Sequence, residues 1–378
     1  MANPKLRVLS IFGTRPEAVK MAPVVKQLQA AAGIEPFVCV TAQHREMLDQ
    51  VLTLFDIVPD FDLDLMRPAQ TLAELTGRVF RELNPVLEQI RPDWILIQGD
   101  TTTVMAAGLL GYYNRIRVGH VEAGLRTGDK WQPFPEEVNR KVASVVADLH
   151  FAPTAWAEEN LLREGVPQES IRVTGNPVID ALQLVIKKPY DLQRGPLSDV
   201  SEEQRVVLVT AHRRENFGPP LERIFRALRQ LAATYQDEVV LIYPVHLNPN
   251  VLEPAQRMLG DVPNIRLIEP LAYLPMAHLM ARADLVLTDS GGLQEEAPAL
   301  GSPVLVLRDV TERPEALEAG TALLVGTQTD VIVRQARKLL DNPDAHAAMA
   351  RAINPYGDGH AAERIVAAVL KADVPCAA

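Results

Sequence analysis

The stretch LRVLSIFGTRPEAVKMAPVVKQL (residues 6–28) joins an apolar run of strand length to a short turn with one glycine, and then to a predicted helix. A strand, a glycine-bearing turn and a helix in this order present backbone N–H groups to a phosphate. The turn matches neither GxGxxG nor GxxxxGK(S/T), because Arg15 stands where a second glycine would be expected. The stretch therefore predicts the first strand–helix unit of an α/β fold, with an unusual ligand turn.

The same alternation of short apolar runs and longer helical stretches continues along the chain. Strands are predicted at 6–12, 36–42, 93–99, 116–122, 149–154, 171–176, 205–212, 238–246, 264–270, 283–290, 303–309 and 322–327. Near-continuous apolar strands between helices indicate parallel sheets that are covered on both faces. Six strands in each half predict two doubly wound domains, and the proline-bearing, charged stretch 187–204 is predicted as linker and surface loop.

Two stretches, 92–122 and 283–309, follow one plan of strand, acidic-polar turn, small-residue helix and strand. Both turns come after the carboxyl end of a strand, where open α/β sheets bind ligands. Two such domains facing each other would hold a ligand in the cleft between them.

Composition restricts the class of protein. A chain of 378 residues predicts about two domains at ~150 residues each, and 47% hydrophobic with 23% charged residues is typical of a soluble globular protein. The net charge of −10, without blocks of basic residues, argues against a nucleic-acid or anionic-membrane binder. Two cysteines form no disulfide framework, and signal-peptide and membrane-span patterns are absent, so we expect a cytoplasmic protein.

Some residues of the first turn are explained by local structure alone, and others are not. Gly13 permits a tight turn, Pro16 suits the first helical position, and Glu17 complements the helix dipole. Arg15 and Lys20 are not explained in this way. Together they place a forked donor and a point charge beside a helix N-terminus, which suits a diphosphate.

Carboxylates follow two successive predicted strands of the first half. Asp100 ends one buried strand, although it could also be a helix N-cap. Glu122 closes the next strand, where a buried carboxylate costs free energy unless it is paired or used. Glu136 or Glu137 with Arg140 can be ordinary helical pairing. Because Asp100 and Glu122 are expected at neighbouring strand ends, we predict an acid/base site there.

The second half offers groups suited to a nucleotide. His212 ends a strand and can meet a pyrophosphate or a leaving-group oxygen, whereas the neighbouring Arg214 fits a surface basic loop equally well. Ser290, Gly291 and Gly292 precede a helix and allow a phosphate close to the backbone. A glutamate one turn into that helix, Glu295 or Glu296, is placed for ribose hydroxyls. Arg313 follows the next strand. The histidines are scattered, without HExxH, CxxC or a nicotinamide-type GxGxxG, so we predict neither a metal nor a cofactor.

Eight motifs occur in order from residue 13 to 359: GTRPEAVKMAPV, GDTTT, GHVEAGLRTGD, PEEVNR, TAHRREN, TDSGGLQEEAP, RDVTERPEAL and NPYGDG. With them, the chain resembles the non-hydrolysing UDP-N-acetylglucosamine 2-epimerases of bacteria. The resemblance implies a GT-B architecture, two Rossmann-like domains with the active site in the cleft between them. It also implies a C-terminal helix that returns to the first domain, so we expect domains at 1–175 plus 358–378 and at 176–357.

The family reaction interconverts UDP-GlcNAc and UDP-ManNAc without NAD or metal. The family eliminates UDP to give a 2-acetamidoglucal and then adds UDP back with protonation on the other face of C2. The resemblance thus implies a UDP-sugar as substrate, a homodimer, and a supply of ManNAc units for cell-surface polysaccharide. A GT-B glycosyltransferase using a UDP-sugar is the alternative, but it would not need three acid/base groups around C2. A hydrolysing epimerase that releases free ManNAc is a third interpretation.

Residue by residue, the family's catalytic groups correspond to Asp100, Glu122, Glu136 and His212. Its phosphate-side and active-site residues near the N-terminus correspond to Arg15 and Lys20, and its contacts to uridine and phosphate correspond to Ser290, Gly291, Gly292 and Glu295 or Glu296. We also expect Arg140, Arg214, His246 and Arg313 to bind the substrate. Which carboxylate serves which face of C2 stays open. Some members also bind UDP-GlcNAc as an activator, and Gln43 and His44 match that stretch. Glu46 and Ala69 depart from it, which argues against activation here.

Overall fold

The computed structural model describes residues 5–41, 45–67 and 70–372. Its internal contacts divide the chain into two units. Unit 1 comprises Met1–Leu184 and Tyr356–Ala378, and unit 2 comprises Val185–Pro355. The boundaries expected from the sequence, after residues 175 and 357, stay predictions.

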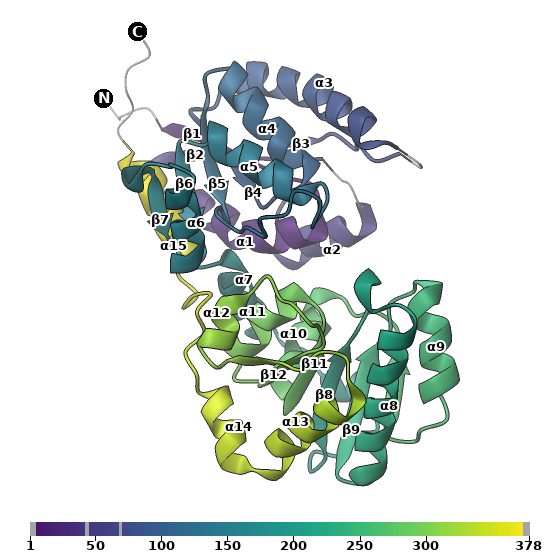
Figure 1. Ribbon diagram of the computed structural model, residues 1–378. Helices are drawn as coiled ribbons and strands as arrows, with labels where there is room; N and C mark the ends of the chain where they lie inside the picture. The colour runs from purple at the N-terminus through teal and green to yellow at the C-terminus, as the bar shows by residue number, and fades with distance from the viewer. Residues whose placement is uncertain (1–4, 42–44, 68–69, 373–378) are drawn as a thin grey trace. The chain divides into compact units, whose positions relative to one another are not determined.

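Each unit is built on one parallel sheet (Figure 1). Unit 1 has β1 (Leu6–Phe12), β2 (Ile34–Val40), β3 (Phe61–Asp62), β4 (Trp94–Gln98), β5 (Arg117–Val121), β6 (Leu149–Ala152) and β7 (Ile171–Val173), in the order β3-β2-β1-β4-β5-β6-β7. Unit 2 has β8 (Arg205–Thr210), β9 (Val239–Pro244), β10 (Ile265–Ile268), β11 (Leu285–Thr288), β12 (Val304–Val306) and β13 (Ala322–Leu324), in the order β10-β9-β8-β11-β12-β13. The order reverses beside β1 and beside β8, which are the switch points where such sheets bind ligands.

The fold class predicted from the sequence, α/β with two Rossmann-like domains, is confirmed. Every strand that was predicted is present, but the count of six strands in the first half was wrong, because β3 adds a seventh to the described sheet. Only Phe61 and Asp62 form β3, and they pair with the end of β2. Two residues are too few to show the periodicity of a strand.

Helices connect the strands of both sheets. Unit 1 begins with α1 (Arg15–Ala30), α2 (Arg45–Leu54), α3 (Leu72–Ile90), α4 (Thr102–Tyr113), α5 (Glu136–Val146), α6 (Ala155–Arg163), η1 (Gln168–Ser170) and α7 (Pro177–Ile186), the last of which crosses the unit boundary. Unit 2 continues with η2 (Leu192–Arg194), η3 (Arg214–Asn216), α8 (Pro219–Thr234), α9 (Pro249–Leu259), α10 (Tyr273–Arg282), α11 (Gly291–Ala299), α12 (Pro314–Glu318), α13 (Thr329–Asp341) and α14 (Pro343–Ala350). The predicted linker at 187–204 contains η2 and otherwise turns and irregular chain.

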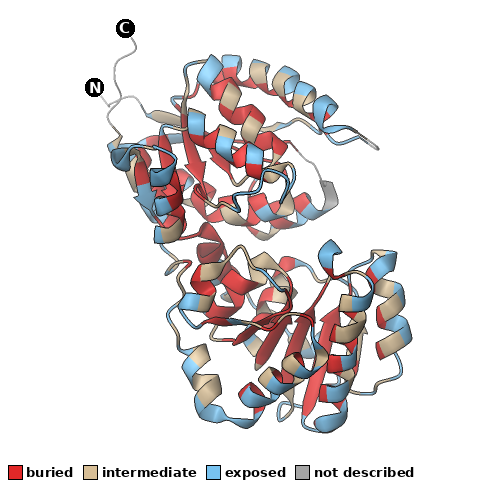
Figure 2. Cartoon of the chain, viewed as in Figure 1, coloured by how far each residue is buried: buried red, intermediate tan, exposed pale blue. Residues whose placement is uncertain are grey.

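The strands form the core of each unit (Figure 2). All five residues of β4 and all six of β9 are buried, which is why these runs are almost wholly apolar. Burial on both faces therefore explains the sequence pattern that predicted them.

The final helix, α15 (Ala361–Lys371), packs on α1 in unit 1. The Asp180 carboxylate accepts hydrogen bonds from the N–H groups of Ala361 and Ala362, at 3.2 and 2.8 Å. Burial raises the pKa of Asp180. Just before the helix, Gly357 has φ 132° and passes Gly175 so closely that a Cβ on Gly175 would lie 3.2 Å from the Gly357 Cα. Both the cap and this close approach fix the returning segment.

Among the described residues, the helices are all too short or too polar to cross a membrane.

Candidate active site

The β1–α1 turn is a capping box. Thr14 is the N-cap of α1 and accepts from the Glu17 N–H, while the Glu17 carboxylate accepts from the Thr14 N–H. The sequence predicted Pro16 as the first residue of the helix, but the helix begins at Arg15 and Pro16 is the second. The tight-turn role expected for Gly13 also needs correction, because its φ lies outside the left-handed region. Gly13 is required by space, since a Cβ there would lie 1.9 Å from Thr41 Oγ1.

Glu122 lies in a cradle of three donors at the end of β5. Lys20 Nζ contacts its two carboxylate oxygens at 2.5 and 2.7 Å. Gln98 Nε2 donates at 2.5 Å and Asn176 Nδ2 at 2.9 Å. The carboxylate is buried, and the backbone has φ 62°, which is uncommon outside glycine. An ammonium and two amides therefore hold this carboxylate in place.

Asp100 lies at the end of β4, next to the β5 end that carries Glu122. It forms an ion pair with Arg140 on α5, and its backbone carbonyl accepts from Asn139 Nδ2 at 2.9 Å. The N-cap interpretation of Asp100 was wrong, because Thr101 occupies the N-cap of α4. The Asp100 side chain is therefore held by α5 and does not serve its own helix.

Helix α5 carries the remaining predicted groups of unit 1. Glu136 is its first residue and is half-buried. Glu137 is buried, accepts from the Thr127 and Gly128 N–H groups at 3.2 and 3.1 Å, and contacts Arg140 at 3.3 Å. The i, i+3 partner of the arginine is thus Glu137.

His120 on β5 is buried and holds the backbone at the end of β4 by a hydrogen bond. Its Nε2 donates to the Gly99 carbonyl at 2.7 Å, one residue before Asp100. Burial lowers the pKa of His120 to about 4, so the ring is neutral near pH 7. A neutral ring with its proton on Nε2 fixes the peptide that leads into Asp100.

In unit 2, the β11–α11 turn is the counterpart of these strand ends. Ser290 is the N-cap of α11, and its side chain makes no cap hydrogen bond. The preceding Asp289 is fully buried, and its Oδ2 accepts from the N–H groups of His212 and Arg213 at 2.8 Å each and from Asn216 Nδ2 at 3.0 Å. Asp289 thereby fixes the loop after β8 against the turn before α11.

Arginines flank the glycines of this turn. A Cβ built on Gly291 would lie 3.6 Å from a terminal nitrogen of Arg213 and 3.8 Å from one of Arg313. Arg214, in contrast, is exposed on η3, which favours the surface-loop interpretation for that residue. The arginine beside the turn is Arg213. Two guanidinium groups and the first N–H groups of a helix form a site suited to a diphosphate.

Both candidate glutamates of α11 are buried and engaged. Glu295 forms an ion pair with Arg313. Glu296 accepts from the Tyr273 hydroxyl at 2.8 Å, and one of its oxygens would lie 3.2 Å from a Cβ on Gly292. Glu295 therefore orients Arg313, and Glu296 is the carboxylate beside the second glycine.

The rings of His212 and His246 stack with their centroids 5.5 Å apart. Burial lowers the pKa of His212, which the charge of Asp289 opposes and His246 reinforces. The two rings therefore contact each other where β8 and β9 end. His246 Nδ1 also accepts a hydrogen bond from the Asn248 N–H at 3.0 Å.

The predicted residues are thus divided between the two units. Unit 1 carries Arg15, Lys20, Asp100, Glu122, Glu136 and Arg140, and unit 2 carries His212, Arg214, His246, Ser290, Gly291, Gly292, Glu295, Glu296 and Arg313. Arg15 is the first residue of α1 and half-buried. Gln43, His44 and Ala69 lie outside the described residues, so the activator prediction is not tested.

Several polar residues at these sites did not stand out in the sequence. They are Gln98, Thr101, Asn139, Asn176, Arg213 and Asp289. Asp289 and Thr101 share one signal with the predicted residues, since each follows the carboxyl end of a strand in a switch-point turn. Asn139 lies within α5 and carries no such signal. Asn176 follows β7, which is at the edge of the sheet and away from the switch point, and its partner Glu122 lies 54 residues away.

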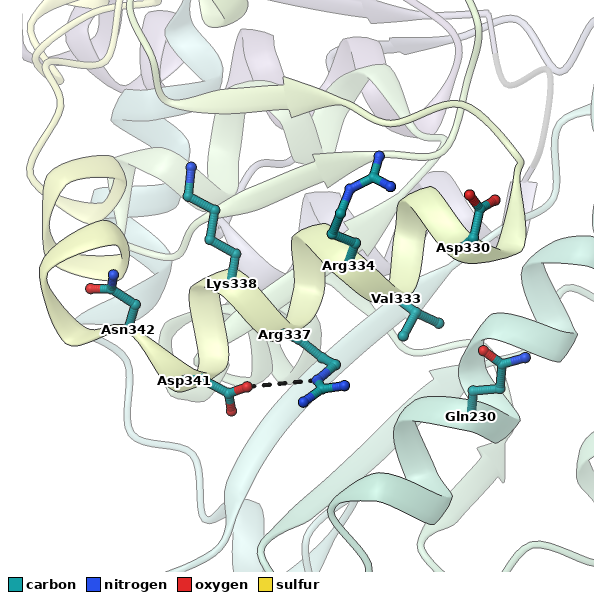
Figure 3. A pocket seen from close by; sticks show the side chains of 8 residues that line it. All are labelled: Gln230, Asp330, Val333, Arg334, Arg337, Lys338, Asp341 and Asn342. Carbon is teal, nitrogen blue, oxygen red and sulfur yellow. Dashed lines mark ion pairs between the residues drawn. The ribbon is translucent and has the colours of Figure 1, made fainter.

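No group of three or more His, Cys, Asp or Glu suited to a metal occurs within residues 5–41, 45–67 and 70–372. A hollow of about 610 Å³ lies on α13 and α8 (Figure 3). Its lining includes Arg334, Arg337, Lys338 and Asp341, and the Arg337–Asp341 pair is half-exposed at 3.7 Å. Exposed pairs of this kind contribute little, and the hollow contains none of the predicted residues.

Comparison with known proteins places these groups in context. The family model described as UDP-N-acetylglucosamine 2-epimerase matches residues 26–370. The probable UDP-N-acetylglucosamine 2-epimerase of Ralstonia solanacearum is 56% identical, over 96% of this chain and 98% of that protein. The Neisseria meningitidis UDP-GlcNAc 2-epimerase, solved bound to UDP-GlcNAc, is similar at 48% identity and TM-score 0.89, over 97% of this chain and 100% of the other. The Methanocaldococcus jannaschii enzyme, solved with UDP-GlcNAc and UDP, is similar at 32% identity and TM-score 0.79, over 97% and 99%.

Proposed function

Because the chain belongs to the UDP-N-acetylglucosamine 2-epimerase family and is therefore an isomerase, we propose that it interconverts UDP-GlcNAc and UDP-ManNAc by loss and re-addition of UDP. The substrate class is supported by the relative from Neisseria meningitidis, which was solved bound to UDP-GlcNAc. The sequence resemblance is thereby confirmed at the level of the family.

The chemistry of C2 requires an indirect route. The C2 proton is not next to a carbonyl, so it is not acidic enough for direct removal. In the elimination, the C1–O bond breaks, its electron pair leaves with UDP, the C2 proton passes to a base, and a C1=C2 double bond forms. Re-addition of UDP with a proton delivered to the opposite face of C2 gives the epimer. Oxidation states are unchanged over the cycle, so NAD is not consumed.

The observation that carries this proposal is the pair of cation-bound carboxylates at adjacent strand ends of unit 1. Asp100 with Arg140, and Glu122 with Lys20, place two acid/base groups at one edge of the sheet. We assign Asp100, Glu122 and Glu136 to proton transfer at C2. Two of these carboxylates are paired with cations, so several acidic side chains can share this edge with less mutual repulsion.

We assign the uridine diphosphate to unit 2. The first N–H groups of α11, with Arg213 and Arg313 beside Gly291, support binding of the phosphates. His212, whose pKa is lowered by burial, presents a neutral ring that can donate to the departing oxygen. Glu296, beside Gly292, is assigned to the ribose hydroxyls. The activity we propose is cytoplasmic, is carried out by a homodimer and supplies ManNAc units to cell-surface polysaccharide.

Incubation with UDP-GlcNAc in deuterated water tests the reaction. We expect UDP-ManNAc with deuterium at C2, and deuterium in the recovered UDP-GlcNAc, because each passage through the double bond exchanges the C2 proton. Mass spectrometry and proton NMR measure both. The Asp100→Asn and Glu122→Gln variants keep side-chain shape and are expected to lose at least ~100-fold in exchange rate.

Other products would contradict the proposal. Free ManNAc as the stable main product would point to a hydrolysing epimerase. Transfer of the sugar to an added acceptor without C2 exchange would point to a glycosyltransferase.

A further inference from the structure

Glu17 lies where two strand–helix turns of unit 1 meet. It is 3% exposed. Its Oε2 accepts from the Gly13 and Thr14 N–H groups at 2.7 Å each, which completes the capping box of α1. Its Oε1 accepts from the Thr101 hydroxyl at 2.5 Å, across 84 residues of sequence. One carboxylate therefore joins the β1–α1 turn to the β4–α4 turn.

The Thr101 hydroxyl is not needed for local structure. Thr101 is the N-cap of α4, yet its side chain makes no cap hydrogen bond to its own helix. In α3 the corresponding Thr71 hydroxyl accepts from the Glu74 N–H and contacts the Glu74 carboxylate at 2.8 Å, so that box is closed within one turn. The hydroxyl of Thr101 is instead directed to Glu17, and this suits a connection between the two turns.

This connection adjoins both ion-paired carboxylates. Thr101 directly follows Asp100. Lys20 lies three residues after Glu17 and so on the same face of α1, and it holds Glu122 at 2.5 Å. One face of one helical turn thus fixes the ends of β4 and β5. Burial raises the pKa of Glu17, so a donor such as Thr101 matters to the carboxylate it contacts.

We propose that Glu17 is a positioning residue for the epimerase reaction, which sets Asp100 relative to Lys20 and Glu122 through the hydroxyl of Thr101. The inference rests on the function proposed above. Proton transfer requires reacting atoms within fractions of an ångström, and a displacement of ~1 Å can cost ~100-fold in rate. Glu17 itself need not touch the sugar, because it acts through the turn that carries Asp100.

The Thr101→Val variant tests this inference, because it removes the hydroxyl and leaves the capping box of α1 intact. We expect kcat for UDP-GlcNAc to fall by about 10- to 100-fold, with KM within about twofold and UDP affinity unchanged by calorimetry. Thr101→Ser keeps the hydroxyl and is expected to retain kcat within about threefold. Thr101→Ala repeats the deletion without placing a methyl group against the carboxylate, and the same loss is expected.

Thr71→Val is the matched control, because it removes a hydroxyl from the exposed capping box of α3. It is expected to lower the melting temperature with kcat unchanged. If the Thr101 variants change stability alone, with kcat like that of Thr71→Val, the inference is overturned. Its failure is distinct from failure of the proposed function, in which the unmodified protein would not exchange the C2 proton at all.

Discussion

At the scale of single residues, Asn176 connects parts of unit 1 that are distant in sequence. Its Nδ2 donates to Glu122 Oε1 at 2.9 Å, its N–H donates to the Tyr356 carbonyl at 2.7 Å, and its Oδ1 accepts from the Val178 N–H at 3.2 Å. The residue is 1% exposed. Asn176 therefore ties Glu122 to the segment by which the chain re-enters unit 1.

Replacement of this amide should alter the titration of the site. In Asn176→Asp the oxygen that accepts from Val178 is kept, but a carboxylate replaces the donor to Glu122. Two carboxylates at this distance share a proton, so we expect kcat/KM at pH 7 to fall by about 100-fold and the acidic limb of its pH profile to move to higher pH. Rate measurements between pH 5 and 9 check both.

Asn264→Asp is the control for this exchange, because Asn264 donates to the Ala232 and Val239 carbonyls in unit 2. It is expected to lower stability and to leave the shape of the pH profile unchanged. An Asn176→Asp profile that matched the unmodified enzyme would contradict the role given to Asn176.

Candidate site residues were predicted from their position at the end of a strand. Asp100 and Glu122 stand at strand ends, and their place in the turn identified them. Asn176 could not be predicted, because its contact with Glu122 depends on how β5, β6 and β7 lie side by side. The place of Arg213 beside Gly291 could not be predicted either, because the directions of adjacent arginines depend on the backbone of η3.

At the scale of elements, β5 and β6 carry a pair of buried histidines. His120 and His150 are partners in the register of the two strands. Burial lowers the pKa of each to about 4, and the neighbouring histidine contributes to the shift of His150. Both rings are thus neutral within the sheet near pH 7.

This pair predicts loss of stability in acid. The unfolded chain binds a proton at His120 near pH 6.5, but the folded protein binds it only near pH 4. The free energy of unfolding is therefore highest above pH 6.5 and falls as the pH drops from 6.5 to 4, by up to about 3 kcal/mol for this histidine. His120→Gln keeps a donor for Gly99 and should flatten the dependence, as measured by urea unfolding at each pH.

The exposed His360→Gln variant controls for removal of an imidazole at the surface. If His120→Gln and His360→Gln gave the same slope of unfolding free energy against pH, the burial of His120 would not be the cause.

Elements were predicted best where both faces are buried. β4 and β9 are continuous apolar runs and were found from the sequence, whereas β3 depends on tertiary contact with β2. The capping boxes of α1 and α3 could have been predicted from the sequence, since Thr14 with Glu17 and Thr71 with Glu74 have the required spacing. The hydrogen bond between Thr101 and Glu17 could not be predicted, because it joins two turns that are 84 residues apart in the sequence.

At the scale of the whole molecule, the two units repeat one topology with different chemistry. The strand orders agree around β1 and β8, as the echo between 92–122 and 283–309 suggested. The switch-point edge of unit 1 carries carboxylates with cationic partners, and that of unit 2 carries arginines beside a glycine turn. We therefore assign proton transfer to one unit and anion binding to the other, on the same fold.

Unit 1 should depend on the end of the chain. A chain ending at residue 360 lacks α15, whose buried side chains include Ile365 and Val369. Loss of each such side chain typically costs 2–5 kcal/mol, so the deletion would remove most of the ~5–15 kcal/mol that stabilises a domain. Hydrogen exchange should show fast amides in β1, β4 and β5 and protected amides in β8, β9 and β11.

A chain ending at residue 372 keeps α15 and is the control, with protection expected in both sheets. Equal protection of β1 and β8 in the shorter chain would contradict the dependence of unit 1 on α15.

The return of α15 to unit 1 also sets an order for biosynthesis. Residues 185–355 leave the ribosome as one uninterrupted segment, so unit 2 is complete while unit 1 still lacks its last helix. Domains usually form in the order of synthesis, amino-terminal first, but here the amino-terminal unit is finished last. Until α15 arrives, the apolar face of α1 is open to chaperones and proteases. A nascent chain that stops before residue 361 would therefore leave this face exposed, and only a chain that includes α15 would close the unit to which we assign proton transfer.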